Sequence, residues 1–339
     1  MSRTSDAPLA GAAHGAGPAP SPVAAGSGLR VEIARQPAIL DQVLTLNAAA
    51  LGRVGELVQA AVVVRIAGIG SSRHVAGYAA EALGCLAGIP AVTLAAPGAG
   101  IPQPAFHPGD LLVVASQSGR TPALLELAAE ARRAGARVAA IVNEPASPLG
   151  DAADELLLAG AAPEQAIPAT GSVTGSMLLA RVLAGPVPPD DRARLVEDVV
   201  AMLGGTSVVP APVPRQVLVD GAAGSWVAAE IALKFAEIVG LTVTGYGLVD
   251  GLHGPLAAGG PVLAFVDPAD PNARLLGERV DVLRADRVLP DAGERAHRDP
   301  WLRAIARVVR GQLLAVAWAE LLGIDVDNPR GLSKITRTA

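Results

Sequence analysis

The sequence predicts an α/β protein made of two modules, each a parallel sheet flanked by helices. From Val62 onward, short apolar runs alternate with helical stretches, which is typical of parallel strands that are buried on both faces. A segment rich in Gly, Pro, Thr and Ser separates two such series, and 339 residues suffice for two medium-sized domains. We therefore predict a tail at 1–28, a first module at 29–203, a linker at 204–214 and a second module at 215–339.

The first module is predicted from a regular alternation of apolar and amphipathic stretches. Order is expected to begin near Leu29 and to continue into a helix at about 38–60. The predicted strands are short and rich in β-branched residues or leucine: 62–67, 91–95, 111–116, 138–142 and 155–158. The predicted helices lie between and after these strands: 73–87, 122–134, 147–153, 172–183 and 189–203.

The second module is predicted as a shorter, diverged repeat of the first. Its expected strands share the same apolar character: 216–220, 241–244, 261–266 and 287–289. Its main helices are expected at 225–239 and 301–322.

Composition argues against several classes of partner. The net charge is −5, Lys and Arg do not cluster, and only 2% of residues are aromatic, so nucleic acid is not an expected partner. Cys85 is the single cysteine, which excludes an intrachain disulfide and fits a reducing cytoplasm. The longest uncharged stretch is interrupted by prolines, and the N-terminus has no basic segment before an apolar run. We therefore expect a cytoplasmic protein with a disordered Ala/Gly/Pro/Ser tail and no membrane span.

A glycine turn follows the first predicted strand and begins a helix. The segment Gly68-Ile-Gly70-Ser-Ser72-Arg73 is similar to a dinucleotide fingerprint, but Arg73 stands at the third glycine position. The stretch 90–94, which should supply an acidic ligand for the ribose, has none. What remains is a turn that brings hydroxyls and backbone N–H groups to a helix N-terminus, which suits a phosphate.

A second hydroxyl-rich turn follows the predicted strand 111–116. It reads Ser116-Gln117-Ser118-Gly-Arg-Thr121, and Pro122 then begins a helix. Ordinary capping by Ser118 or Thr121 is the simpler alternative, but one cap needs a single hydroxyl. Three hydroxyls at the carboxyl end of a strand favour a phosphate site.

The two turns together resemble a sugar isomerase (SIS) domain. They supply its Gly-x-Gly-x-Ser and Ser-x-Ser-Gly-x-Thr patterns, one strand-helix-strand apart. SIS domains are flavodoxin-like α/β modules that bind phosphosugars. The resemblance implies that the substrate phosphate and its adjoining hydroxyls are held by residues of these turns: Ser72, Ser116, Gln117, Ser118 and Thr121.

The chain contains only two lysines, Lys234 and Lys334, among 27 basic residues. Lysine differs from arginine because its amine can lose a proton and attack a carbonyl. In 221–249 the only charged residues are Glu230, Lys234 and Glu237, whose spacing puts them on one face of an apolar helix. They could form a surface ion pair, but a single charged stripe favours burial beside a cleft. There we expect a carboxylate with a raised pKa, suited to general base catalysis.

Two further motifs extend the resemblance. His253 precedes Gly-Pro-Leu and is expected in a loop, and the polar stretch 327–336 contains Lys334. With the stripe of Glu230, Lys234 and Glu237, they resemble the isomerase half of glucosamine-6-phosphate synthase and its stand-alone deaminase and deglycase relatives.

This narrower resemblance implies a role for each residue. Lys334 is the amine that reaches the sugar carbonyl, and Glu237 moves a proton between C1 and C2. His253 assists ring opening from a neighbouring subunit, which implies a homodimer. Lys234 and Glu230 position and polarise the site.

The loop at 163–174 departs from the family pattern. It lacks a serine at Ala169 and a lysine at Gly171, so Thr170 or Ser172 is expected to substitute. Ile167 and Thr170 are the residues of this loop that we expect to contact substrate. No metal ion or cofactor is expected.

The expected activity is an isomerising deaminase acting on a hexosamine phosphate, such as glucosamine 6-phosphate giving fructose 6-phosphate and ammonia. The synthase takes ammonia from a glutaminase domain, for which this chain has no room, and Cys85 falls inside a predicted helix. Two alternatives remain open: a fructosamine-6-phosphate deglycase and a non-catalytic phosphosugar sensor.

Overall fold

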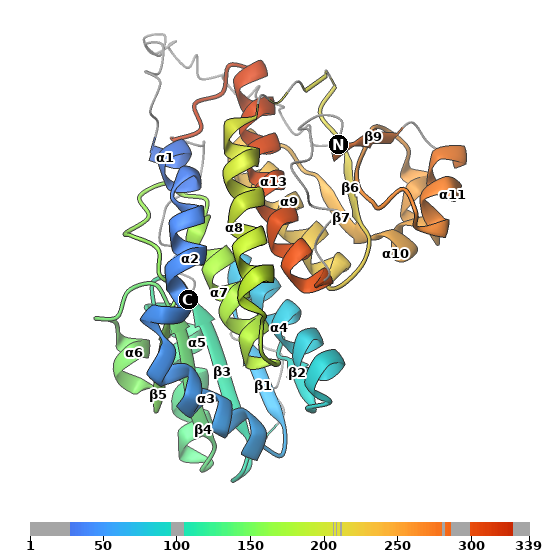
Figure 1. Ribbon diagram of the computed structural model, residues 1–339. Helices are drawn as coiled ribbons and strands as arrows, with labels where there is room; N and C mark the ends of the chain where they lie inside the picture. The colour runs from blue at the N-terminus through green and yellow to red at the C-terminus, as the bar shows by residue number, and fades with distance from the viewer. Residues whose placement is uncertain are drawn as a thin grey trace, which may run out of the picture.

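The computed structural model describes residues 28–95, 105–205, 207, 209–210, 212–279, 282–285 and 299–327. It is an α/β fold with two parallel sheets, as the sequence predicts (Figure 1). Figure 1 shows one sheet in the lower part of the molecule and the other at the upper right, with helices between them.

The first sheet has five strands in the order β2-β1-β3-β4-β5, all parallel. In chain order its strands are β1 Val64–Ala67, β2 Ala91–Thr93, β3 Leu111–Ser116, β4 Arg137–Val142 and β5 Glu155–Leu158. Its intervening helices are α4 Ser71–Ala87, α5 Pro122–Arg133 and α6 Pro148–Ala152. Every residue of the central strand β3 is buried, because helices cover both faces of the sheet.

The second sheet has four described strands in the order β7-β6-β8-β9, again parallel. These are β6 Gln216–Val219, β7 Thr244–Gly247, β8 Val262–Phe265 and β9 Val282–Arg284. The helices of this half are α9 Gly224–Val239, α10 Leu248–Leu252, the 3₁₀ turn η1 Pro255–Ala258, α11 Pro271–Arg279 and α13 Pro300–Leu321.

A layer of helices joins the two sheets. The remaining helices are α1 Gly28–Ala34, α2 Gln36–Leu46, α3 Ala48–Ala60, α7 Gly171–Leu183 and α8 Pro189–Gly204. Helix α4 of the first half packs against α9 of the second, and α9 packs against α13. The Tyr78 hydroxyl donates to the carbonyl of Trp301 at 3.0 Å, and their rings meet edge to face. The two halves therefore share one continuous core across α4, α9 and α13.

Two predicted elements differ from the structure. The helix expected at 38–60 is two helices that meet at Asn47, whose amide bonds the backbone N–H and carbonyl of Leu158 in β5. The strand expected at 241–244 is β7, which begins only at Thr244 because Gln216 pairs with that residue. Leu241 and Thr242 are exposed after the left-handed Gly240, outside the sheet.

Some predicted segments fall partly or wholly outside the described residues. The tail at 1–28 and the strand at 287–289 are among them. The predicted linker lies between the end of α8 at Gly204 and the start of β6 at Gln216. Among the described residues, no helix combines the length and apolar character needed to cross a membrane.

Candidate functional site

The glycine turn lies at the carboxyl end of β1 and leads directly into α4. Gly70 occupies the N-cap position, so Ser71 and Ser72 form the first turn of the helix. Both serines are partly exposed. Their backbone N–H groups belong to a helix N-terminus, where the helix dipole favours an anion.

The second hydroxyl-rich turn lies at the carboxyl end of β3. Ser116 Oγ accepts a hydrogen bond from the Gly119 N–H at 3.2 Å and lies 3.5 Å from Thr121 Oγ1. Gly119 has a φ of +60° and packs on Ser147, where a Cβ would lie 2.2 Å from the Ser147 Oγ. The turn therefore requires glycine.

The capping alternative for this turn is not what the structure shows. Thr121 is the N-cap residue of α5, yet within the described structure its side chain makes no capping hydrogen bond. Ser118 Oγ instead accepts from the Arg120 N–H at 3.3 Å. The Arg120 guanidinium donates to the Ala146 carbonyl at 2.9 Å. The N-terminus of α5 is thus not closed by a side chain of its own cap residue.

The two turns lie at the same edge of the first sheet. Strands β1 and β3 are parallel neighbours, with Ala67 opposite Val114, so their carboxyl ends are adjacent. Open α/β sheets bind ligands at such an edge. Gln117, which is partly exposed, belongs to this edge, and its carbonyl accepts from the Asn143 N–H at 3.0 Å.

Two of the three charged residues of α9, Glu230 and Lys234, are buried as expected, and the cluster contacts the N-terminal turn of α4. Lys234 Nζ lies 2.6 Å from Glu237 Oε2 and 3.4 Å from Glu230 Oε1. It also donates to Ser71 Oγ at 3.0 Å. The side chain of Lys234 is fully buried, that of Glu230 is 2% exposed, and that of Glu237 is 22% exposed. Of the two carboxylates, only that of Glu237 has appreciable contact with solvent.

Neighbouring charges shift the pKa values of Glu230 and Lys234. Burial raises the pKa of Glu230, but the Lys234 charge and the His74 hydrogen bond outweigh it, so the pKa lies below its ordinary value. Burial lowers the pKa of Lys234, yet Glu230 and Glu237 raise it above the ordinary value. The expected raised pKa is therefore wrong for Glu230. Lys234 remains an ammonium ion at neutral pH, suited to electrostatic support rather than nucleophilic attack.

Sequence reasoning missed two members of this cluster, Ser71 and His74. His74 Nδ1 lies 2.7 Å from Glu230 Oε2, and Ser71 accepts from Lys234. Both residues lie in the glycine-turn helix, one turn apart, and face α9. Their spacing of three was visible in the sequence, but the pairing with residues more than 150 positions later was not.

The loop at 163–174 is held by a buried carboxylate. Glu164 accepts hydrogen bonds from Thr170 Oγ1 at 3.1 Å and from Ser172 Oγ at 2.5 Å, and also from the backbone N–H groups of both residues. Thr170 is fully buried and Ile167 is partly exposed. The hydroxyl protons of Thr170 and Ser172 are thus already donated to Glu164. Both residues are buried, so in this structure their hydroxyls hold the loop and are not exposed to a ligand.

The two remaining predicted residues are His253 and Lys334. His253 directly follows α10 and is exposed, so the expected loop is a short turn after a helix. Lys334 lies outside the described residues. The tail that leads to it reaches Asp327, whose carboxylate accepts from the N–H groups of Gly28 and Leu29 at the start of α1.

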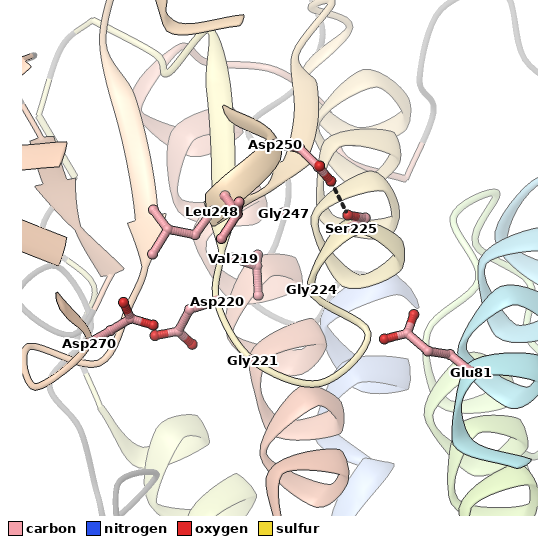
Figure 2. Close-up of a pocket in the computed structure, with 11 residues that line it drawn as sticks. Glu81, Val219, Asp220, Gly221, Gly224, Ser225, Gly247, Leu248, Asp250 and Asp270 are labelled. Atoms are coloured by element: carbon pink, nitrogen blue, oxygen red, sulfur yellow. Dashed lines mark hydrogen bonds between the residues drawn. The ribbon is translucent and has the colours of Figure 1, made fainter. Parts of the chain in front are cut away.

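A cavity of about 210 Å³ lies at the carboxyl edge of the second sheet (Figure 2). It is lined by Glu81, Asp220, Asp250 and Asp270, and none of the described residues that line it is Lys or Arg. Figure 2 shows Asp220 and Asp270 pointing toward one another, and Ser225 donates to Asp250 at 3.0 Å. Arg307 pairs with Asp220 at 2.6 Å, but the other three carboxylates leave the lining acidic and less suited to a phosphate. The edge of the first sheet is therefore the better place for an anionic ligand.

Within the described ranges, no three His, Cys, Asp or Glu side chains gather to hold a metal ion.

Comparison with known proteins agrees with the fold and with the first module. The family model of the SIS domain matches residues 57–184. The glutamine–fructose-6-phosphate aminotransferase (isomerizing) of Zymomonas mobilis is 27% identical over 276 residues, covering 68% of this chain and 45% of that protein. The enzyme of the same name from Symbiobacterium thermophilum is 29% identical over 358 residues, covering 89% and 58%. The chain spans about half the length of these curated relatives.

Solved structures share the fold. A putative phosphosugar isomerase from Silicibacter pomeroyi superposes with a TM-score of 0.72 at 24% identity, covering 89% of this chain and all of that one. A glucosamine-6-phosphate deaminase from Thermotoga maritima gives 0.73 at 21%, covering 92% and 100%.

These findings show what the chain is similar to. Residues 57–184 match the SIS domain, and the chain shows homology to the isomerase half of the glutamine–fructose-6-phosphate aminotransferases. The family match covers the first module alone, so a second SIS domain at 215–339 stays a prediction.

Proposed function

We propose that this protein is an isomerising deaminase that converts a hexosamine 6-phosphate into a ketose 6-phosphate and ammonia. The observation that carries the proposal is the contact between Lys234 and Ser71. It puts a buried ammonium ion and the partly exposed carboxylate of Glu237 beside the helix that begins at the glycine turn. A phosphate site and an acid–base group are then close enough to act on one small sugar.

In this proposal the first module holds the phosphate. Ser72 and the turn from Ser116 to Thr121 supply hydroxyls and backbone N–H groups at the carboxyl edge of the sheet. Gln117, within that turn, contacts an adjoining sugar hydroxyl. Ile167, which is partly exposed, contacts the substrate from the loop at 163–174. Thr170 is fully buried and donates its hydroxyl proton to Glu164, so it holds this loop in place and does not touch the sugar.

The chemistry is assigned to the stripe of α9 and to two residues from elsewhere. After the sugar ring opens, Glu237 takes the proton from C2 and returns a proton to C1, so the amine carbon becomes an imine. Water adds to that imine, ammonia leaves, and the water oxygen becomes the ketone oxygen. Lys234 supports the negative charge that develops on the sugar, and Glu230 holds Lys234 in place. Lys334 forms a transient Schiff base with the ketone carbonyl and releases water, and addition of water later restores the ketone and the free amine. His253 of a second copy assists ring opening.

An ammonia-release assay tests the proposal. The purified protein is incubated with glucosamine, galactosamine and mannosamine 6-phosphates, and ammonia and ketose phosphate are measured together. We expect one-to-one formation of both products from at least one substrate. Glu237→Gln should lower kcat by about 100-fold or more, because general acid–base catalysis contributes about 10²–10⁴-fold.

The matched control is Glu278→Gln, which removes a carboxylate from an exposed ion pair on α11 and should leave turnover unchanged. Fructosamine 6-phosphates are assayed in parallel. Release of an aldose 6-phosphate from these, with free hexosamine phosphates untouched, would identify a deglycase instead. Turnover of none of the sugars would refute enzymatic phosphosugar chemistry and leave the sensor alternative.

A further inference from the structure

The contact between His74 and Glu230 in the α9 cluster has no role in the proposed reaction. The His74 imidazole, 18% exposed, lies on α4 with Nδ1 2.7 Å from Glu230 Oε2. Glu230 is itself 2% exposed. A hydrogen bond that is largely shielded from water is electrostatically strong, and losing either partner leaves the other buried without a hydrogen bond.

The protonation of this pair follows from the chemistry of the two groups. The pKa of Glu230 lies below its ordinary value, so its carboxylate is ionised near neutral pH and can only accept hydrogen bonds. His74 must therefore carry a proton on Nδ1. In neutral His74 the free nitrogen is then Nε2.

His74 also determines how the single ammonium ion is shared. Lys234 is the only lysine of the cluster and faces two carboxylates, at 2.6 Å to Glu237 and 3.4 Å to Glu230. His74 hydrogen-bonds Glu230 Oε2, whereas Glu230 Oε1 has no hydrogen bond among the described residues and lies 3.4 Å from the ammonium ion. The imidazole thus offsets part of the charge of Glu230, and Lys234 keeps its short contact with Glu237. Without the imidazole, the charge of Glu230 would have Lys234 as its one close cationic partner in this cluster. The carboxylate would draw Lys234 away from Glu237.

We propose that His74 is a positioning residue for the α9 cluster: by hydrogen-bonding Glu230, it keeps the Lys234 ammonium ion on Glu237. This inference rests on the proposed function for its catalytic consequence, since Glu237 is the proposed base. It concerns a residue that acts through Glu230 and does not touch the sugar. Its loss therefore slows proton transfer and leaves substrate binding largely intact.

Three variants separate positioning from the other roles that a histidine can have. His74→Asn keeps an N–H donor near the place of Nδ1 but has no counterpart of Nε2. His74→Ala removes both. His107→Ala is the control, since His107 is exposed at the opposite, amino end of β3.

We expect His74→Ala to lower kcat about 10- to 100-fold on the hexosamine phosphate that the wild type uses, the usual effect of a misplaced catalytic group. KM should stay within about twofold, His74→Asn should recover kcat to within about threefold of wild type, and His107→Ala should match wild type. The double variant His74→Ala/Glu230→Gln should be no slower than its slower parent, because both changes act on one contact.

Equal losses in His74→Asn and His74→Ala would overturn the proposal, since the ring nitrogen Nε2 would then do the work. Unchanged kcat in His74→Ala, beside an inactive Glu237→Gln, would overturn it while leaving the proposed function intact. A readout without substrate covers the cases in which the wild type turns over no sugar or His74→Ala does not fold. Long-range ¹H–¹⁵N spectra of the wild type, with His74 assigned by its loss in His74→Asn, should show a proton on Nδ1. A neutral ring protonated on Nε2 would overturn the proposal by itself.

Discussion

Replacing Lys234 by methionine should destabilise the protein strongly, and the reason is burial. Methionine keeps most of the volume of the side chain and removes only the charge. Lys234 is fully buried and Glu230 is 2% exposed, so the variant leaves a carboxylate in the protein interior without its ammonium partner. Breaking a buried ion pair in this way costs about 3–5 kcal/mol.

An exposed ion pair on α11 provides the matched control. The side chains of Arg274 and Glu278 are 86% and 55% exposed, and the spacing of four residues is the same as for Glu230 and Lys234. Pairs exposed to solvent contribute about 0–1 kcal/mol. Arg274→Met should therefore change the free energy of unfolding by less than about 1 kcal/mol, against several for Lys234→Met.

The pH dependence of the loss gives a second readout. In the wild type the pKa of Glu230 is lowered, so its stabilisation is present above the unfolded pKa and is lost as pH falls through the folded one. In Lys234→Met the burial of Glu230 is no longer offset by the ammonium ion. The folded pKa of Glu230 should then rise above its unfolded value, and the deficit should shrink as pH falls and the carboxylate takes up a proton.

The assay is urea unfolding of wild type and both variants at pH 8 and pH 5, followed by circular dichroism. We expect a larger deficit for Lys234→Met at pH 8 than at pH 5. Adding Glu230→Gln should recover part of the loss, because no buried charge then remains on that residue. A loss below about 1 kcal/mol, or one that grows toward pH 5, would refute a buried, charge-compensated cluster.

Two further predictions follow from other contacts. Gly77→Ala should lower the free energy of unfolding by about 1–3 kcal/mol in the same assay, because a Cβ there would lie 2.1 Å from the Trp226 ring. Gly84→Ala in the same helix meets nothing within 4 Å and should be neutral or stabilising, so equal losses would contradict this packing. If His253 serves a neighbouring subunit, co-expressed Glu237→Gln and His253→Gln chains should regain activity in mixed dimers. Mixed dimers without activity, formed from two variants that are each inactive alone, would contradict the shared site.

The sequence predicted eight of the nine described strands because their signal is local, but it did not predict β9 at Val282–Arg284. Strand β3 is buried along its whole length, and its unbroken apolar run already indicated a strand covered on both faces. The charged stripe of α9 was predictable for the same reason, since three charges at helical spacing on an apolar helix must lie on one face of that helix. Helical periodicity cannot reveal what such a face meets.

What the sequence could not predict depends on contacts between distant segments. The helix break at Asn47 is fixed by hydrogen bonds to Leu158, 111 residues later. His74 lies 156 residues before Glu230, and nothing around it in the sequence marks it as the partner of a buried carboxylate. The lowered pKa of Glu230 follows from the same contacts, because burial alone would have raised it.

The most direct test of the central claim is a crystal structure of the protein with fructose 6-phosphate. The account predicts the phosphate against Ser72 and the turn from Ser116 to Thr121, with sugar carbons C1 and C2 about 3–3.5 Å from the Glu237 carboxylate. A phosphate bound instead in the acidic cavity of the second sheet, or a sugar whose C1 and C2 lie away from Glu237, would contradict it.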